Sequence, residues 1–248
     1  MSFVGKTASV FGVVGLSTLA TLGVVESASA VTVKKGLDYL ETNSGTFFTF
    51  NEIGKVDFKG NFIGMFNGDD VGRTDTIVER KNDVVVSGQT PIEVLAISLK
   101  SKTAVDIGQS SFDIFVNLTP GSSSTGTMII NDNGTFSSVF DVHFTANFKP
   151  VGGGDSIPCP VTNCNFWKTF TASGNWSEEP QPGSFRGPES SNFFTVGETT
   201  HDTGGGGHIV STATVPEPLT ILGSATALGC GAFLKRQYAK KLSNKDVS

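Results

Sequence analysis

The sequence predicts an all-β protein with a single antiparallel β-sandwich ectodomain, jelly-roll-like or immunoglobulin-like, an N-terminal signal helix and one short C-terminal transmembrane helix. Three observations lead to this fold class. Charged residues make up only 17% of the chain and Phe supplies 20 of its aromatic residues, a composition that favours strands over helical bundles. Many short runs alternate apolar and polar residues. Turn-forming residues separate nearly all of these runs.

The first 30 residues have the pattern of a secretory signal peptide. Lys6 is the only charged residue before an apolar stretch at 8–25, and the small residues Ala28, Ser29 and Ala30 follow. We therefore expect cleavage after Ala30. An uncleaved N-terminal anchor is the alternative.

Residues 31–203 are expected to form the sandwich, and the clearest strand runs from Phe136 to Phe148. Residues of one parity in this run are mostly apolar and those of the other are polar, so one face is expected in a core and the other in water. A turn at 131–134 joins it to an extended run at 126–130, which predicts a hairpin. Similar runs predict strands at 46–50, 56–62, 76–80, 83–86, 95–99, 112–118, 166–172, 193–196 and 208–212.

Two loops and a linker are expected between and after these strands. The loops cover 150–164 and 174–192, which are rich in Gly or Pro. The glycine run at 204–207 and the residues up to 214 are interpreted as a flexible Gly-rich linker. Cys159 and Cys164 lie in the first loop, and an oxidising compartment favours a local disulfide between them; free thiols are the alternative.

The charge is unevenly distributed along the chain. Residues 31–214 contain 12 Lys and Arg against 20 Asp and Glu. An acidic domain of this kind argues against nucleic acid as a partner.

The C-terminal region has three parts in a fixed order. The motif Val215, Pro216, Glu217 and Pro218 comes first, an apolar run at 219–234 follows, and a basic flank at 235–241 begins with Lys235 and Arg236. The apolar run is shorter than the roughly 20 residues of an ordinary spanning helix. Snorkelling of the basic side chains to the membrane surface reduces the number of apolar residues that are needed. We expect a transmembrane helix at 219–234 with the acidic domain outside, and a polar tail at 242–248.

This order resembles the PEP-CTERM sorting domain, and the resemblance is confined to 215–241. Proteins with this domain resemble substrates of exosortases, membrane proteases of Gram-negative bacteria that make exopolysaccharide. The resemblance implies that 215–218 is the processing motif and that an exosortase-like membrane protease is a partner. It also implies export, anchoring in the inner membrane before processing, and a final place at the cell surface or outside the cell. A plain single-pass anchor with an accidental Pro-Glu-Pro is the alternative.

Two groups of side chains are weak metal candidates. Asp69, Asp70 and Asp75 surround a turn and offer the oxygen ligands that Ca²⁺ prefers, but their spacing does not match an EF-hand and acidic turns are ordinary in β proteins. His201 and His208 flank the glycine run, where a flexible linker would not hold metal geometry. We expect no bound metal and no cofactor.

Sequence motifs of hydrolases and of phosphate-binding loops do not occur in the chain. The sequence therefore favours a non-enzymatic structural or adhesive role in the envelope or extracellular matrix. The first alternative is a carbohydrate-binding module for exopolysaccharide, in which Trp167 or Trp176 would stack on sugars. The second is a secreted hydrolase, because paired carboxylates that meet only in the fold leave no sequence signature.

Overall fold

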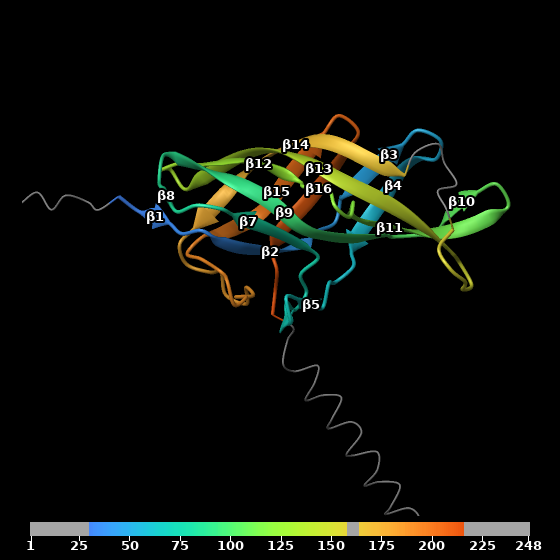
Figure 1. Cartoon of the computed structure of the whole chain (residues 1–248), viewed down its shortest axis with the longest axis horizontal. Helices are drawn as coiled ribbons and strands as arrows, with labels where there is room; N and C mark the ends of the chain where they lie inside the picture. Colours follow the sequence, from blue (N-terminus) through green and yellow to red (C-terminus); the bar gives the residue numbers. More distant parts are fainter. Residues whose placement is uncertain (1–29, 158–163, 216–248) are drawn as a thin grey trace, which may run out of the picture. The chain divides into compact units, whose positions relative to one another are not determined.

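The structure is a computed structural model that describes residues 30–157 and 164–215 (Figure 1). In these ranges the chain forms strands, turns and irregular segments but no helix, which confirms the all-β class. The strands are β1 (Thr32–Val33), β2 (Gly36–Thr42), β3 (Phe47–Phe50), β4 (Gly54–Gly60), β5 (Met65–Phe66), β6 (Asp69–Asp70), β7 (Thr76–Arg80), β8 (Val84–Val85), β9 (Gly88–Ser101), β10 (Val105–Ile107), β11 (Ser110–Leu118), β12 (Thr125–Ile130), β13 (Thr135–Pro150), β14 (Asn165–Ser177), β15 (Phe194–Thr203) and β16 (Gly206–Thr212).

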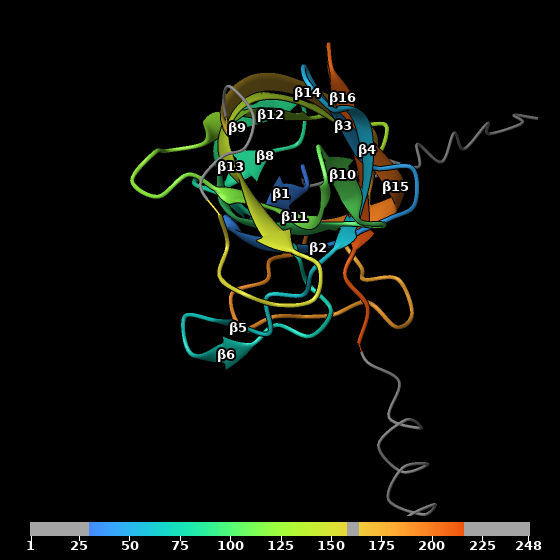
Figure 2. The same cartoon turned by 90° about the vertical axis from the view of Figure 1, so that its right-hand side faces the viewer.

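The main sheet closes on itself, so the predicted sandwich is wrong. Eight antiparallel neighbours form the ring, in the order β9, β11, β13, β14, β15, β16, β2, β7 and back to β9. Figure 2 shows these strands arranged around a common interior. A sandwich would keep two separate sheets with open edges, whereas here β9 pairs with both β7 and β11 and joins the two ends of the sheet.

Two long strands make the closure possible. β9 has 14 residues and β13 has 16, and shorter strands fill the space between them. β12 pairs with one half of each long strand and β11 with the other half. At the opposite side of the ring, β3 and β4 provide a second connection between β16 and β9.

The interior of the barrel is the main hydrophobic core. Alternate residues of β13 are buried from Phe136 to Phe148, as the period-two pattern predicts. Aromatic rings fill much of the space: Phe140 stacks on Phe170 with ring centroids 5.8 Å apart, and Phe144 stacks on Phe166 at 5.3 Å. An eight-stranded barrel is narrow enough for side chains to fill it.

A smaller cluster lies on the outer face of β2 and β7. It contains the buried side chains of Leu37, Tyr39, Val71, Ile77 and Ala213. The loop between β4 and β7 and the loop before β15 cover it, and Tyr39 meets Phe185 edge to face with ring centroids 5.3 Å apart. β2 and β7 are therefore buried on both faces, and consecutive residues are buried at 37–40 and 76–78.

The predicted Gly-rich linker at 204–214 is wrong, because most of it is β16. β15 and β16 form a hairpin in which His201 lies directly opposite His208. One of the glycines, Gly206, permits a close backbone approach, since a Cβ added there would lie 2.7 Å from the carbonyl oxygen of Phe47. The loop expected at 174–192 begins later than predicted, since β14 extends to Ser177.

Candidate functional site

A chain of buried polar groups crosses the wall of the barrel. The Thr42 hydroxyl at the end of β2 donates to Asp75 Oδ1 over 2.7 Å, and the Thr42 amide donates to Asp75 Oδ2 over 2.7 Å. The Thr76 hydroxyl also donates to Oδ1, over 2.9 Å. His208 Nε2 of β16 lies 3.0 Å from the Thr42 oxygen. Because the Thr42 hydroxyl proton is directed to Asp75, His208 must donate from Nε2 to complete the chain.

Burial controls the ionisation of this chain. It raises the pKa of Asp75 to about 6, against the opposing hydrogen bonds from Thr42 and Thr76. Burial lowers the pKa of His201 to about 4. Burial, together with the neighbouring His201, holds the pKa of His208 well below its usual value. Both imidazoles are therefore neutral at pH 7, with ring centroids 5.5 Å apart.

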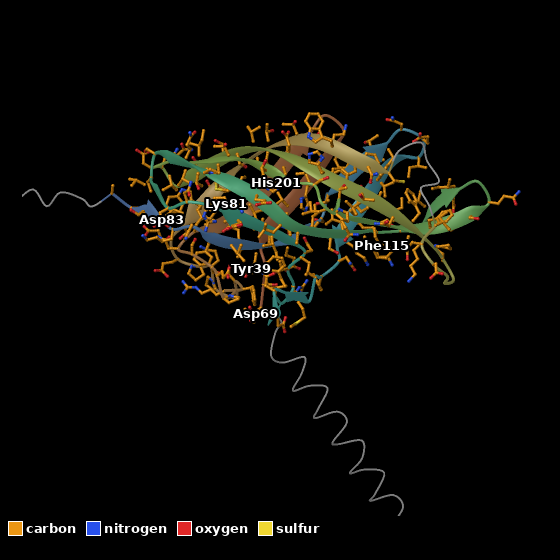
Figure 3. The ribbon with its side chains drawn as sticks, viewed as in Figure 1. Tyr39, Asp69, Lys81, Asp83, Phe115 and His201 are labelled. Carbon is orange, nitrogen blue, oxygen red and sulfur yellow. The ribbon has the colours of Figure 1, made fainter. Side chains whose placement is uncertain are left out.

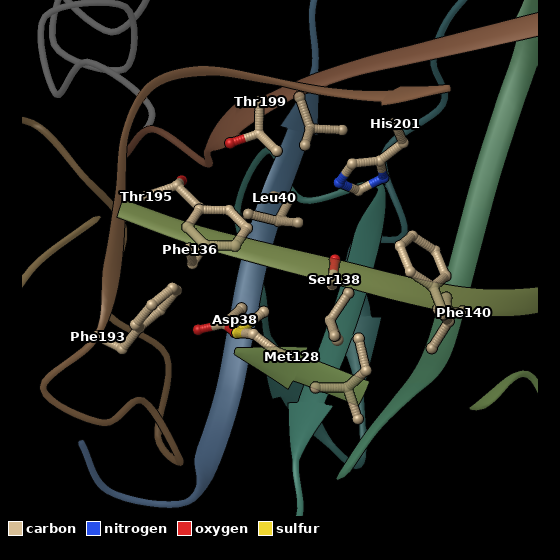
Figure 4. Close-up of a pocket in the computed structure, with 14 residues that line it drawn as sticks. Asp38, Leu40, Met128, Phe136, Ser138, Phe140, Phe193, Thr195, Thr199 and His201 are labelled. Atoms are coloured by element: carbon tan, nitrogen blue, oxygen red, sulfur yellow. The ribbon is translucent and has the colours of Figure 1, made fainter. Parts of the chain in front are cut away.

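Two small cavities adjoin these histidines inside the barrel. Each has a volume of about 20 Å³, and His201 lines both. Figure 4 shows the first cavity, where Ser138, Thr199 and His201 are among otherwise mainly apolar side chains. The hydroxyl of Thr199 is buried without a hydrogen-bond partner. A cavity of roughly 10–15 Å³ is large enough for one water molecule, so each of these spaces is far too small for a sugar or a peptide.

A buried ion pair lies near the same interior. The Arg80 guanidinium contacts the Asp38 carboxylate and the Ser191 hydroxyl, and it lies over the Phe193 ring at 4.6 Å. Burial raises the pKa of Asp38, and the positive charge of Arg80 opposes that rise. Neither residue was a site candidate from the sequence.

The outer surface presents one tryptophan to solvent. Trp167 on β14 is 59% exposed and lies opposite His143 of β13, with ring centroids 6.4 Å apart. Hydrogen-bonded polar side chains flank it, with Thr169 donating to Asp141 over 2.6 Å and Thr145 donating to Asn165 over 2.7 Å.

The second tryptophan has a structural position. Trp176 stacks on Phe193 with ring centroids 5.7 Å apart, and its Nε1 donates to the Asn131 carbonyl over 3.3 Å. Of the two tryptophans that the sequence offers for sugar stacking, the structure therefore leaves Trp167 accessible.

The structure separates the three aspartates that were weak calcium candidates. Asp69 and Asp70 are exposed on β6, whereas Asp75 is fully buried and engaged by Thr42 and Thr76. Across 30–157 and 164–215, no group of three or more His, Cys, Asp or Glu side chains is placed to hold a metal ion. Asp202 is exposed, while the two histidines near it are buried in the barrel.

The cysteine and terminal predictions lie mainly outside the described residues. Cys164 is disulfide-bonded, but Cys159 is not described, so their pairing stays a prediction. Ala30 and Val215 are exposed at the two ends of the described chain. The rest of the signal peptide and of the sorting segment, including Pro216, Glu217, Pro218, Lys235 and Arg236, is not described. The part of the chain that is described contains no helix long and apolar enough to cross a membrane.

Comparison of this chain with protein-family models, with curated proteins and with solved structures finds no match.

Proposed function

We propose that the domain is a non-enzymatic structural or adhesive component of the bacterial envelope or extracellular matrix, exported and delivered by an exosortase-like system. The filled interior of the barrel is the observation that carries this proposal. Its two cavities of about 20 Å³ are each far too small for a sugar or a peptide, so contacts with other macromolecules fall to the outer surface. The sorting pattern at 215–241 supports export and delivery by an exosortase-like system.

Expression of the full chain in hosts with and without an exosortase tests the proposed sorting. We expect the mass of the chain to decrease by the segment after about Pro218, and the product to leave the inner membrane, only in the host that has the protease. An intact C-terminus and membrane retention in both hosts would overturn the sorting proposal.

Deletion of the gene in its own host tests the structural or adhesive role. We expect weaker surface attachment or a less cohesive matrix, restored by the full chain but not by a variant that lacks 215–248. Unchanged attachment and cohesion in the deletion strain would contradict the proposed role.

The exposed Trp167 favours a second candidate function, binding of exopolysaccharide. Its indole face is open to solvent and is flanked by hydroxyl, carboxylate and amide groups that suit sugar hydroxyls. The chain contains two tryptophans, so the fluorescence of a variant that lacks one of them reports on the other.

Titration with exopolysaccharide purified from the host tests this candidate. We expect a fluorescence change in the wild type and in Trp176→Phe, and no change in Trp167→Ala. The control is Val139→Ala, at an exposed apolar position on the neighbouring strand β13, and this variant should bind like the wild type. Equal binding by Trp167→Ala in a sedimentation assay would rule out this surface.

A further inference from the structure

The described chain ends beside the loop between β14 and β15 and near the loop between β4 and β7. The Val215 amide donates to the Gly183 carbonyl over 2.9 Å, and the Phe185 amide donates to the Ala213 carbonyl over 2.6 Å. Ala213 belongs to the outer hydrophobic cluster, against which Ile63 and Phe66 pack. The last described residues are therefore held by the loop between β14 and β15, and they share one hydrophobic cluster with the loop at 61–75. Figures 1 and 2 both show β5 on the side of the barrel where the described chain ends.

Large apolar side chains are exposed on this surface. Met65 is 60% exposed, Phe62 is 49% exposed and Val215 is 48% exposed. We call these three residues the exit surface. Phe62 and Met65 belong to the loop between β4 and β7, and Val215 is at the end of the described chain. Exposed large apolar side chains on one side of a domain indicate a contact with a partner or a membrane.

Polar contacts connect Phe62 to the end of the described chain. The Arg73 guanidinium lies over the Phe62 ring at 5.2 Å and donates to Glu41 Oε1 over 2.6 Å. The Thr214 hydroxyl donates to the other Glu41 oxygen over 3.0 Å. Phe62 and the end of the chain are thus held by one shared carboxylate.

The spacing in the sequence limits how far this surface can lie from the apolar run at 219–234. Only Pro216, Glu217 and Pro218 separate Val215 from Leu219. Four steps of an extended chain span at most about 14 Å, since each residue adds roughly 3.3–3.6 Å. The headgroup layer on each side of a bilayer is roughly 5–8 Å thick. Insertion of the apolar run would therefore bring the exit surface to the headgroups.

We propose that the exit surface docks on the headgroup layer of the membrane while the C-terminal segment is uncut, with Met65 and Phe62 entering that layer. This inference rests on the proposed function, because it requires the predicted anchor. Asp69 and Asp70 are exposed on the same loop, and Arg73, the only basic residue of 61–75, is paired with Glu41, so this loop offers no free positive charge to anionic lipids. Arg186, beside the end of the described chain, lies 4.0 Å from Glu179. A zwitterionic membrane is the matching partner, and cleavage of the anchor releases the contact.

Depth-sensitive fluorescence of the full chain in phosphatidylcholine vesicles tests the docking. A Cys230→Ala background carries Met65→Cys, labelled with a polarity-sensitive dye, and spin-labelled lipids act as quenchers. The matched control is Ile129→Cys, an exposed apolar position on β12, which lies on the opposite side of the barrel from β5 in both views. We expect a blue shift and lipid quenching at position 65 and neither at position 129.

Flotation of the same samples separates the two proposals. Vesicles that carry the chain but leave both dyes in water would overturn the docking and leave the anchor intact. A chain that does not float would overturn the anchor, and the docking with it. Equal quenching at positions 65 and 129 would show contact without the proposed orientation and would also overturn the inference.

Discussion

Arg80 and Asp38 form an ion pair that is buried in the barrel. We expect Arg80→Met to lower the free energy of unfolding by about 3–5 kcal/mol, because the substitution leaves the buried Asp38 carboxylate without its partner. Urea unfolding at pH 7 measures this difference. The control is Arg73→Met, whose ion pair with Glu41 is half-exposed and should contribute less than about 1 kcal/mol. Equal losses in the two variants would contradict the assignment.

His201 makes the stability of the fold depend on pH. Its pKa is about 4 in the folded chain, against the usual 6.5, so the unfolded state binds more protons between these values. The contribution of His201 to the free energy of unfolding therefore falls as the pH drops from 6.5 to 4, by about 3 kcal/mol at most. Asp75 acts in the opposite direction, since its folded pKa of about 6 favours the folded state as the pH falls from 6 toward 3.8.

The variant His201→Phe separates these two effects. We expect it to lose less stability than the wild type between pH 6.5 and pH 4, because the contribution of His201 is gone while those of Asp75 and His208 remain. Urea unfolding at several pH values measures the slope. Val139→Ala, at an exposed position of β13 that does not titrate, is the control and should keep the wild-type slope. An unchanged slope in His201→Phe would contradict the role of its burial.

At the scale of elements, the junction of β12 with β13 tolerates no side chain at Gly126. A Cβ at this position would overlap the Val139 carbonyl oxygen and the Phe140 Cβ. We expect Gly126→Ala to cost about 1–3 kcal/mol or more, because the two backbones must separate. The matched control is Gly204→Ala, where a Cβ meets nothing within 4 Å and the change should stay within about 0.5 kcal/mol. Thermal unfolding of both variants measures the difference, and equal midpoints would refute the close approach.

At the scale of the whole molecule, β16 is required to close the ring. It lies between β15 and β2, so its removal leaves both strands with unpaired backbone groups. We expect a chain of residues 31–215 to unfold cooperatively and a chain of residues 31–203 to lack a cooperative transition. Near-ultraviolet circular dichroism during heating distinguishes them. A flexible linker at 204–214 would instead give both chains the same transition.

Local patterns explain which parts of the fold were predictable. The alternation from Phe136 to Phe148 depends only on one face being buried, and the structure buries that face. The charged residues of the interior left a weaker signal: Asp38 shares its parity with Leu40, and Arg80 with Val78, which places both charges on an inward face. The glycines between His201 and His208 predict a flexible segment. The sequence gives no sign that the backbone of Phe47 lies beside them.

By itself, the sequence determined the all-β class, most of the buried faces, and the prediction of an exported chain with a sorting segment at 215–241. The tertiary structure alone decided that the sheet closes, that β16 belongs to it, and that Trp167 and not Trp176 is open to solvent. The reason is physical. A period of two reports the burial of one face and is identical in a sandwich and a barrel, whereas closure depends on pairings such as Thr42 with Val210, between residues far apart in the chain.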